Sequence, residues 1–126
     1  TEMVWSVNMS PSGHRIVSGS DDKRVIMWDG ETGQLLRTLQ GHADKVKSVS
    51  MSSSGHRIVS GSWDCSVKVW DGEAGQLLPT FKGHMQRVNS VSMGGHRIVS
   101  GSFDGTVKVW DSELGGLLRT LEGHTG

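Results

Sequence analysis

The sequence predicts an all-β fold made of three similar units, each with four short antiparallel strands. The main observation is an internal repeat, because residues 1–42 align with residues 43–84 without a gap and 27 of these 42 positions are identical. A second observation is that β-branched residues alternate with polar ones in short runs bounded by turn-forming residues. No segment has the apolar spacing of a long helix. We therefore expect three units at 1–42, 43–84 and 85–126. The repeat within the last unit is two residues shorter, because Met51-Ser-Ser-Ser-Gly55 becomes Met93-Gly94-Gly95.

The four strands are placed most clearly in the second unit. We expect them at Val46–Met51, Arg57–Ser62, Val67–Trp70 and Leu77–Phe81, separated by segments rich in Gly, Ser and Asp. The fourth run contains Pro79, where the other units have arginine. Because proline cannot donate a ladder hydrogen bond, it belongs on an edge strand. The fourth strand of each unit is therefore expected at the edge of its sheet.

Two dipeptides mark matching places in every unit. They are Gly41-His42, Gly83-His84 and Gly123-His124 at the ends of the units, and Trp28-Asp29, Trp70-Asp71 and Trp110-Asp111 inside them. Both dipeptides step by 42 and then by 40 residues. A period of about 40–45 residues with these two signals resembles the WD-repeat family, and the resemblance covers the whole chain. It implies a β-propeller in which each unit is one four-stranded blade.

The resemblance also implies a buried hydrogen-bonded relay in each blade, running from a Trp indole through Ser and His to Asp. The matching residues are His42, Ser60, Asp64 and Trp70 in the second unit, His84, Ser100, Asp104 and Trp110 in the third, and Ser18, Asp22 and Trp28 in the first. Indole only donates, hydroxyl and imidazole do both, and carboxylate only accepts, so the chemistry suits this order.

A hydrolase triad uses the same residue types as the relay. Against a triad, the set recurs once per unit, and no Gly-x-Ser-x-Gly nucleophile motif accompanies it. The sequence therefore indicates a structural network and no enzyme.

The first unit has no Gly-His before its first strand, whereas His124 follows the last strand of the third. Three blades cannot close a ring, and the two end blades would leave apolar faces exposed. We therefore expect copies of the chain to assemble head to tail, with His124 of one copy completing the first-unit relay of the next. Two copies give six blades and three give nine, and the dimer is favoured slightly. The alternative is a fragment of a larger WD-repeat sensor or scaffold protein.

The resemblance implies partner binding on the propeller face formed by the loops before strand one and between strands two and three. The residue before each relay aspartate projects onto that face, namely Asp21, Trp63 and Phe103. The entrance to the first strand adds Met3, Trp5, Lys45, Lys47, Arg87 and Asn89. Aromatic side chains beside Lys and Arg are typical of interaction hot spots. The leading prediction is a non-catalytic scaffold that binds a protein or peptide there.

Two alternatives stay open at this point. The near-identical units favour a lectin-like ring with one small-ligand site, such as a glycan site, in each blade. The differing residues Asp21, Trp63 and Phe103 favour the scaffold instead. The two aromatic residues could also serve only to pack on neighbouring blades.

Composition narrows the remaining classes of partner. Lys+Arg and Asp+Glu are both 13, and this balance argues against nucleic acid. No apolar run is long enough to cross a membrane, so no membrane partner is expected. The histidines are spread through the units without metal-ligand spacing, so we expect no metal and no cofactor. The single cysteine, Cys65, fits a reducing compartment and a cytoplasmic location.

Overall fold

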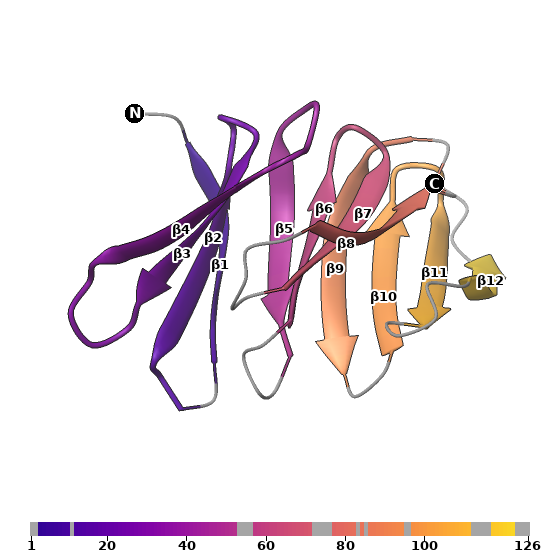
Figure 1. Ribbon diagram of the computed structural model, residues 1–126. Coiled ribbons are helices and arrows are strands. Elements are labelled where there is room, and N and C mark those ends of the chain that lie inside the picture. The colour runs from indigo at the N-terminus through magenta and orange to yellow at the C-terminus, as the bar shows by residue number, and fades with distance from the viewer. Residues whose placement is uncertain are drawn as a thin grey trace.

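The computed structural model describes residues 3–10, 12–52, 57–71, 77–82 (backbone only), 84, 86–94, 97–111 and 117–122. These residues form three four-stranded antiparallel sheets that stand side by side (Figure 1). Within the described residues there is no helix, and hence none that could span a membrane. The prediction of an all-β fold with three four-stranded units is confirmed.

Each sheet follows chain order, so that neighbouring strands are consecutive in sequence. The first sheet holds β1 (Val4–Met9), β2 (Arg15–Ser20), β3 (Arg24–Asp29) and β4 (Leu35–Gln40). The second holds β5 (Val46–Met51), β6 (Arg57–Ser62), β7 (Ser66–Asp71) and β8 (Leu77–Lys82). The third holds β9 (Val88–Gly94), β10 (Arg97–Ser102), β11 (Thr106–Asp111) and β12 (Leu117–Glu122). The strands expected in the second unit match β5 and β6, whereas β7 is longer by one residue at each end and β8 by one residue at its end.

The fourth strand lies at the edge of each sheet, as Pro79 indicates for β8. The pairing of β7 with β8 shifts register between Lys68, which faces Thr80, and Trp70, which faces Leu77. Pro79 falls within this irregular stretch. An edge strand with a local register shift accommodates a residue that has no N–H to donate.

The hydrophobic core lies between the sheets. Strand β5 packs against β1 and β2 of the first sheet, and β9 packs against β5 and β6 of the second. The first junction buries Val17, Val25, Met27, Leu39, Val46, Val49, Met51, Ile58 and Trp70. The second buries Val59, Val67, Val69, Val88, Val91, Ile98 and Trp110. Each inner sheet face is therefore stabilised by its neighbour.

Glycines on the second strands let the first strand of the next sheet approach closely. A Cβ atom on Gly19 would lie 2.6 Å from a Val46 methyl carbon. A Cβ on Gly61 would lie 2.7 Å from methyl carbons of both Val88 and Val91. Valine side chains are stiff, so a methyl group at either glycine would collide with them.

The three sheets form a row, which we call the arc. At its two ends, the positions equivalent to these packed valines and their neighbours are open to solvent. Val4 and Val7 match Val46 and Val49, yet they are 56% and 66% exposed. Val99 matches the fully buried Val59 but is 39% exposed. Both end faces therefore present apolar residues that are covered elsewhere in the molecule. The predicted head-to-tail closure stays a prediction.

Candidate functional site

The four relay residues of the second sheet contact one another in the expected order. Trp70 Nε1 donates to Ser60 Oγ at 2.9 Å, Ser60 Oγ lies 2.6 Å from His42 Nε2, and His42 Nδ1 lies 2.8 Å from Asp64 Oδ2. Since Ser60 accepts from the indole, its own proton is available to Nε2, which leaves Nδ1–H to donate to the carboxylate. The third sheet has the same chain of contacts, at 2.9, 2.7 and 3.0 Å along Trp110, Ser100, His84 and Asp104.

The relay is closed to substrates. Ser60 and Ser100 are both 0% exposed, and both imidazoles are buried. A hydroxyl that already bonds an indole and an imidazole beneath the surface has no face open to an incoming carbonyl group. The geometry serves to join His42, which follows the first sheet, to the interior of the second.

Hydrogen bonding holds Asp64 in its ionised form. Burial alone would raise the pKa of this carboxyl, but hydrogen bonds from His42, Ser66 and the Ala43 backbone N–H hold the pKa well below its ordinary value. The same carboxylate accepts from the Ser66 backbone N–H at 2.9 Å. Asp64 therefore fixes both the imidazole and the turn that leads into β7.

The first sheet has a different arrangement. Trp28 Nε1 donates to Ser18 Oγ at 3.0 Å, as in the other sheets. Asp22 instead accepts from Arg24, whose Nη2 lies 2.6 Å from Asp22 Oδ2. In the described part of the chain, no histidine contacts Ser18 or Asp22. His124 lies outside the described residues, so its completion of this relay remains a prediction.

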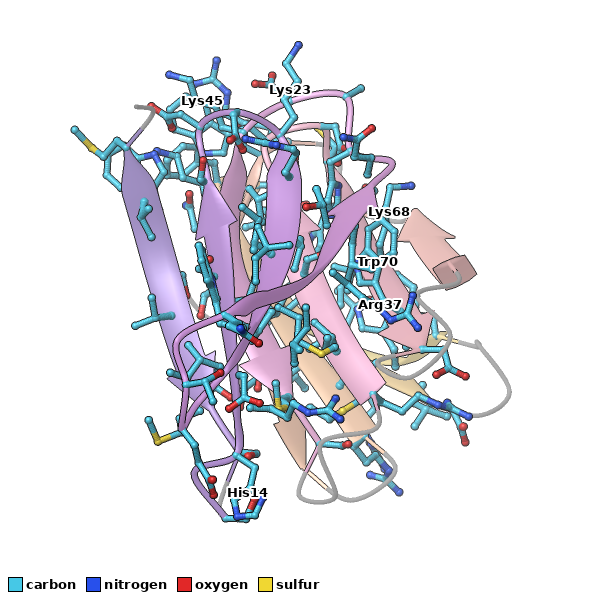
Figure 2. The ribbon with its side chains drawn as sticks, turned by 60° about the vertical axis from the view of Figure 1, so that its left-hand side comes forward. His14, Lys23, Arg37, Lys45, Lys68 and Trp70 are labelled. Carbon is cyan, nitrogen blue, oxygen red and sulfur yellow. The ribbon has the colours of Figure 1, made fainter. Side chains whose placement is uncertain are left out.

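The candidate binding residues gather at one end of the sheets. Lys23 and Lys45 lie at that end, opposite His14 (Figure 2). Three backbone bonds fix the three loops alike, because Asp21, Trp63 and Phe103 donate their N–H to the carbonyls of Met3, Lys45 and Arg87 at 2.9, 2.9 and 3.0 Å. Each loop residue is thereby held beside the entrance to the first strand of its own sheet.

Cations stack on the indoles at this end. Arg87 Cζ and Lys47 Nζ each lie 4.1 Å from the ring centroid of Trp63, and Lys45 Nζ lies 5.1 Å from it. Lys47 Nζ also lies 3.0 Å from the Trp5 centroid. Cation–π attraction stabilises such contacts. The stack joins all three sheets, with Trp5 from the first, Lys47 and Trp63 from the second and Arg87 from the third.

One carboxylate belongs to the same group. Asp21 accepts a hydrogen bond from Trp5 Nε1, and its Oδ2 lies 3.9 Å from Lys45 Nζ. We call this group the Trp63 cluster, made of Trp5, Asp21, Lys45, Lys47, Trp63 and Arg87. The pKa of Lys47 is lowered, and burial is the largest cause. The charge of Asp21 opposes the shift, and the charges of Lys45 and Arg87 add to it by smaller amounts.

The remaining candidates lie beside the cluster. Phe103 is 56% exposed and Met3 is 58% exposed. Asn89 is half-buried in β9 and makes no hydrogen bond with the cluster in the described part of the chain. Trp63 is half-buried, and Arg87 of the neighbouring sheet lies over its ring. Trp63 thus packs on a neighbouring sheet while Phe103 stays open to solvent.

Residue types alone did not reveal three features of this region. The order of the cation stack depends on how the sheets pack, which the sequence does not display. The Trp63 indole Nε1 is buried and has no acceptor among the described residues. A cavity of about 280 Å³ is lined by Asp22, Lys23, Arg24, Gln40, Gly41 and His42. The described residues contain no cluster of His, Cys, Asp or Glu that could hold a metal ion.

The model of the "WD domain, G-beta repeat" family matches residues 1–29, 33–71 and 75–111. Each matched segment ends at a Trp-Asp dipeptide. The segment 33–71 holds β4 of the first sheet together with β5, β6 and β7 of the second. The sequence repeat and the sheet are therefore out of phase by one strand, which explains how His42, after β4, contacts Ser60 in β6.

Several known proteins are similar to this chain in sequence or in fold. The ribosome biogenesis protein BOP1 homolog of Drosophila grimshawi is 50% identical over 40 residues, and that of Drosophila melanogaster is 48% identical over 40 residues. Each match covers 32% of this chain and 5% of the relative. Among solved structures, that of U3-55K has a TM-score of 0.94 and 28% identity, and that of the RRP9 WD40 repeats has 0.94 and 29%.

Both structural matches cover 99% of this chain, which spans 41% and 40% of the solved chains. The fold is thus common to the full set of three sheets, whereas the curated relatives match over a stretch as long as one repeat. Because the family model matches most of the sequence in three segments, the chain belongs to the WD-repeat family.

Proposed function

We propose that this chain is a non-catalytic interaction scaffold that binds a protein or peptide on the surface made by the Trp63 cluster and Phe103. The observation that carries the proposal is the convergence of Trp5, Trp63 and Arg87 from three different sheets on one end of the molecule. Trp and Arg are enriched at the energetic centres of protein interfaces. Phe103, 56% exposed, extends the aromatic surface beyond the cluster.

The buried relay supports a non-catalytic role. Ser60 and Ser100 are 0% exposed, and the hydroxyl of each already has two partners, an indole and an imidazole. The relatives bear names that concern ribosome biogenesis, and those names belong to the relatives. They give no support to the cytoplasmic location or to the absence of a nucleic-acid partner, both of which stay predictions for this chain.

A selection from a random-peptide display library tests the scaffold proposal. Peptides enriched on the parent protein should lose binding at least about tenfold on a Trp63→Ala, Phe103→Ala double variant, since hot-spot truncations cost about 2 kcal/mol or more. Leu36→Ala is the matched control, because Leu36 is an exposed apolar residue on the edge strand β4. Equal binding of the selected peptides to parent and double variant would contradict the proposal.

The lectin-like alternative receives less support. A lectin-type ring needs one equivalent site per blade, whereas the three equivalent positions have different surroundings. Asp21 pairs with Lys45, Trp63 lies beneath three cations, and Phe103 is exposed. A glycan-array signal with one ligand per blade would restore that alternative.

We further propose that the two end faces of the arc pack against further copies of this chain, head to tail, with residues 1–42, 43–84 and 85–126 as its blades. In both internal junctions, two valines fill the space left by a glycine of the preceding sheet, which we call the glycine notch: Val46 and Val49 at Gly19, and Val88 and Val91 at Gly61. Val4 and Val7 are the equivalent valines of the first sheet and are exposed. At the other end, Gly101 has the equivalent position, and among the described residues a Cβ there would come within 4 Å of Ser90 Cβ alone. The free ends thus present the two halves of the internal contact.

The loops at the binding end support the same assembly. Across the first junction Lys45 lies 3.9 Å from Asp21, and across the second Arg87 lies 4.1 Å from the Trp63 centroid. The equivalent pair across a junction between copies is Met3 with Phe103, both exposed in one chain. Phe103 would then be partly covered, as half-buried Trp63 is by Arg87, with the rest of its ring still open to a partner. Methionine and phenylalanine make favourable sulfur–aromatic contacts. A ring of two copies, with six blades, is favoured over three copies with nine.

A further inference from the structure

We infer that the Trp63 cluster binds an acidic segment of the partner, through the carboxylates of Asp or Glu side chains. The inference rests on the proposed function and specifies the chemistry of the ligand. It follows from the balance of charges in the cluster, from the partners that each charge has within the molecule, and from the surfaces that the aromatic rings leave open.

Cations outnumber anions in the cluster. Lys45, Lys47 and Arg87 all lie within 5.1 Å of the Trp63 ring centroid. The carboxylate within the cluster is that of Asp21, which already accepts from Trp5 and lies 3.9 Å from Lys45. Outside the cluster, the Asp44 carboxylate accepts from the Lys45 backbone N–H at 2.7 Å. Among the described residues, neither Lys47 nor Arg87 has a carboxylate within ion-pair distance. Two positive charges therefore remain available to an external anion.

The cations are packed together in a way that an anion would relieve. Lys47 Nζ lies between two indoles, 3.0 Å from the Trp5 centroid and 4.1 Å from that of Trp63. Burial, and to a smaller degree the charges of Lys45 and Arg87, lower the pKa of Lys47 against the opposing charge of Asp21. A carboxylate placed beside Lys47 and Arg87 favours the charged form and gains charge-assisted hydrogen bonds.

The aromatic residues distinguish an acidic peptide from a nucleic acid. Proteins that bind single strands use free aromatic faces on which bases stack. Here Lys47 occupies a face of Trp5, and Lys47 and Arg87 lie against Trp63. The open aromatic surface is that of Phe103, which suits an apolar side chain next to the carboxylates.

The test is fluorescence anisotropy with a short fluorescein-labelled peptide of alternating Glu and Ser around a central Phe. The matched probe has Gln in place of every Glu, and an oligouridylate RNA of equal length is the third probe. The protein variants are Lys47→Gln and Arg87→Gln. The control is Arg37→Gln, because Arg37 is an exposed cation on the edge strand β4 (Figure 2).

We expect the Glu peptide to bind more tightly than the Gln peptide and to weaken as NaCl is added. Each of Lys47→Gln and Arg87→Gln should reduce its affinity by about 2- to 5-fold, as loss of a partly exposed ion pair does. Arg37→Gln should leave it unchanged. Circular dichroism of each variant checks that the strands are retained.

Three results would overturn the inference. The first is that the Glu and Gln peptides bind equally well, or that neither binds, while display-selected peptides still need Trp63 and Phe103. The scaffold proposal then survives without the acidic ligand. Another is tighter binding of the RNA with loss in the same two variants, which makes nucleic acid the ligand. The third is Glu-peptide binding that neither variant weakens, which places the acidic site elsewhere. If the selected peptides are also indifferent to Trp63 and Phe103, the scaffold proposal fails with it.

Discussion

The junction between the second and third sheets and the open face of the third sheet are built from the same kinds of residue but differ in what covers them. In the junction, Val88 and Val91 lie against Gly61, and Val59 is fully buried. On the open face, Gly101 has the place of Gly61, and Val99 that of Val59 but with 39% exposure. The sequence of one blade thus specifies half of a contact.

The difference shows where the stability of this fold resides. The backbone hydrogen bonds between strands lie within each sheet. Both hydrophobic clusters, by contrast, contain residues from two sheets. In repeat architectures stability is approximately the sum of each unit and its contacts with neighbours. A blade on the inside of the arc therefore has two stabilising contacts, and a blade at either end has one.

The largest effect should come from filling the occupied notch. Gly61→Ala places a methyl group 2.7 Å from carbons of Val88 and Val91, so it should reduce the free energy of unfolding by about 1–3 kcal/mol. Gly101→Ala is the matched control, and at a protein concentration low enough to keep the proposed assembly dissociated it should leave the unfolding of one chain almost unchanged. Urea denaturation followed by circular dichroism measures both. Equal losses from the two substitutions would contradict the comparison.

The relay provides a second comparison, between Asp64 and Asp22. Asp64→Asn breaks the carboxylate's bond with buried His42 and should cost about 1–3 kcal/mol of unfolding free energy. Asp22→Asn loses a contact with Arg24, whose side chain is 42% exposed, and should cost about 0.2–1 kcal/mol. The same urea titration compares them. A larger loss for Asp22→Asn would indicate that the Asp22 carboxylate has a further hydrogen-bond partner besides Arg24, as the predicted contact with His124 of another copy would provide.

The pH dependence should follow the same residue. The pKa of Asp64 is lowered in the folded state, so its contribution to stability is full above the ordinary aspartate value of 3.8 and is lost as the pH falls below it. The Asp64→Asn variant should therefore lose less stability than the parent between neutral pH and this acid range. Melting temperatures at a series of pH values test the difference. Parallel curves for the two proteins would exclude Asp64 as a source of acid lability.

The smallest effect on stability is expected at the Trp63 cluster. Lys47→Gln removes a charge at the surface end of the sheets and should change the free energy of unfolding by no more than about 0.5 kcal/mol. The same substitution should lower the affinity for an acidic peptide by about 2- to 5-fold. Urea titration of this variant beside Gly61→Ala separates a binding surface from a structural junction. A loss comparable to that of Gly61→Ala would place Lys47 among the structural residues.

The repeat made much of the fold predictable. Alternating apolar residues located β5 and β6 to the residue, and Pro79 indicated an edge strand. The order Trp70, Ser60, His42 could be expected from donors and acceptors together with the family resemblance. These features depend on local pattern and residue chemistry, and both are visible along one chain.

Other features depend on contacts that one repeat does not reveal. The pairing of Asp22 with Arg24 occurs where no described imidazole contacts the aspartate, and it uses a residue that the other units lack. Cys65 has a φ of 72°, like Gly105 at 86° in the third sheet, so this turn position requires a left-handed backbone. The cation stack depends on the packing of all three sheets, since its members come from each of them.

The molar mass in solution tests the central claim that the end faces are halves of one more junction. Light scattering at micromolar concentration should give two or three times the 13.6 kDa chain mass for the parent protein. Gly101→Ala fills the notch that Val4 and Val7 of another copy would enter, so this variant should fall to the mass of one chain while keeping its strand signal. A well-folded parent protein with the mass of a single chain would contradict the claim.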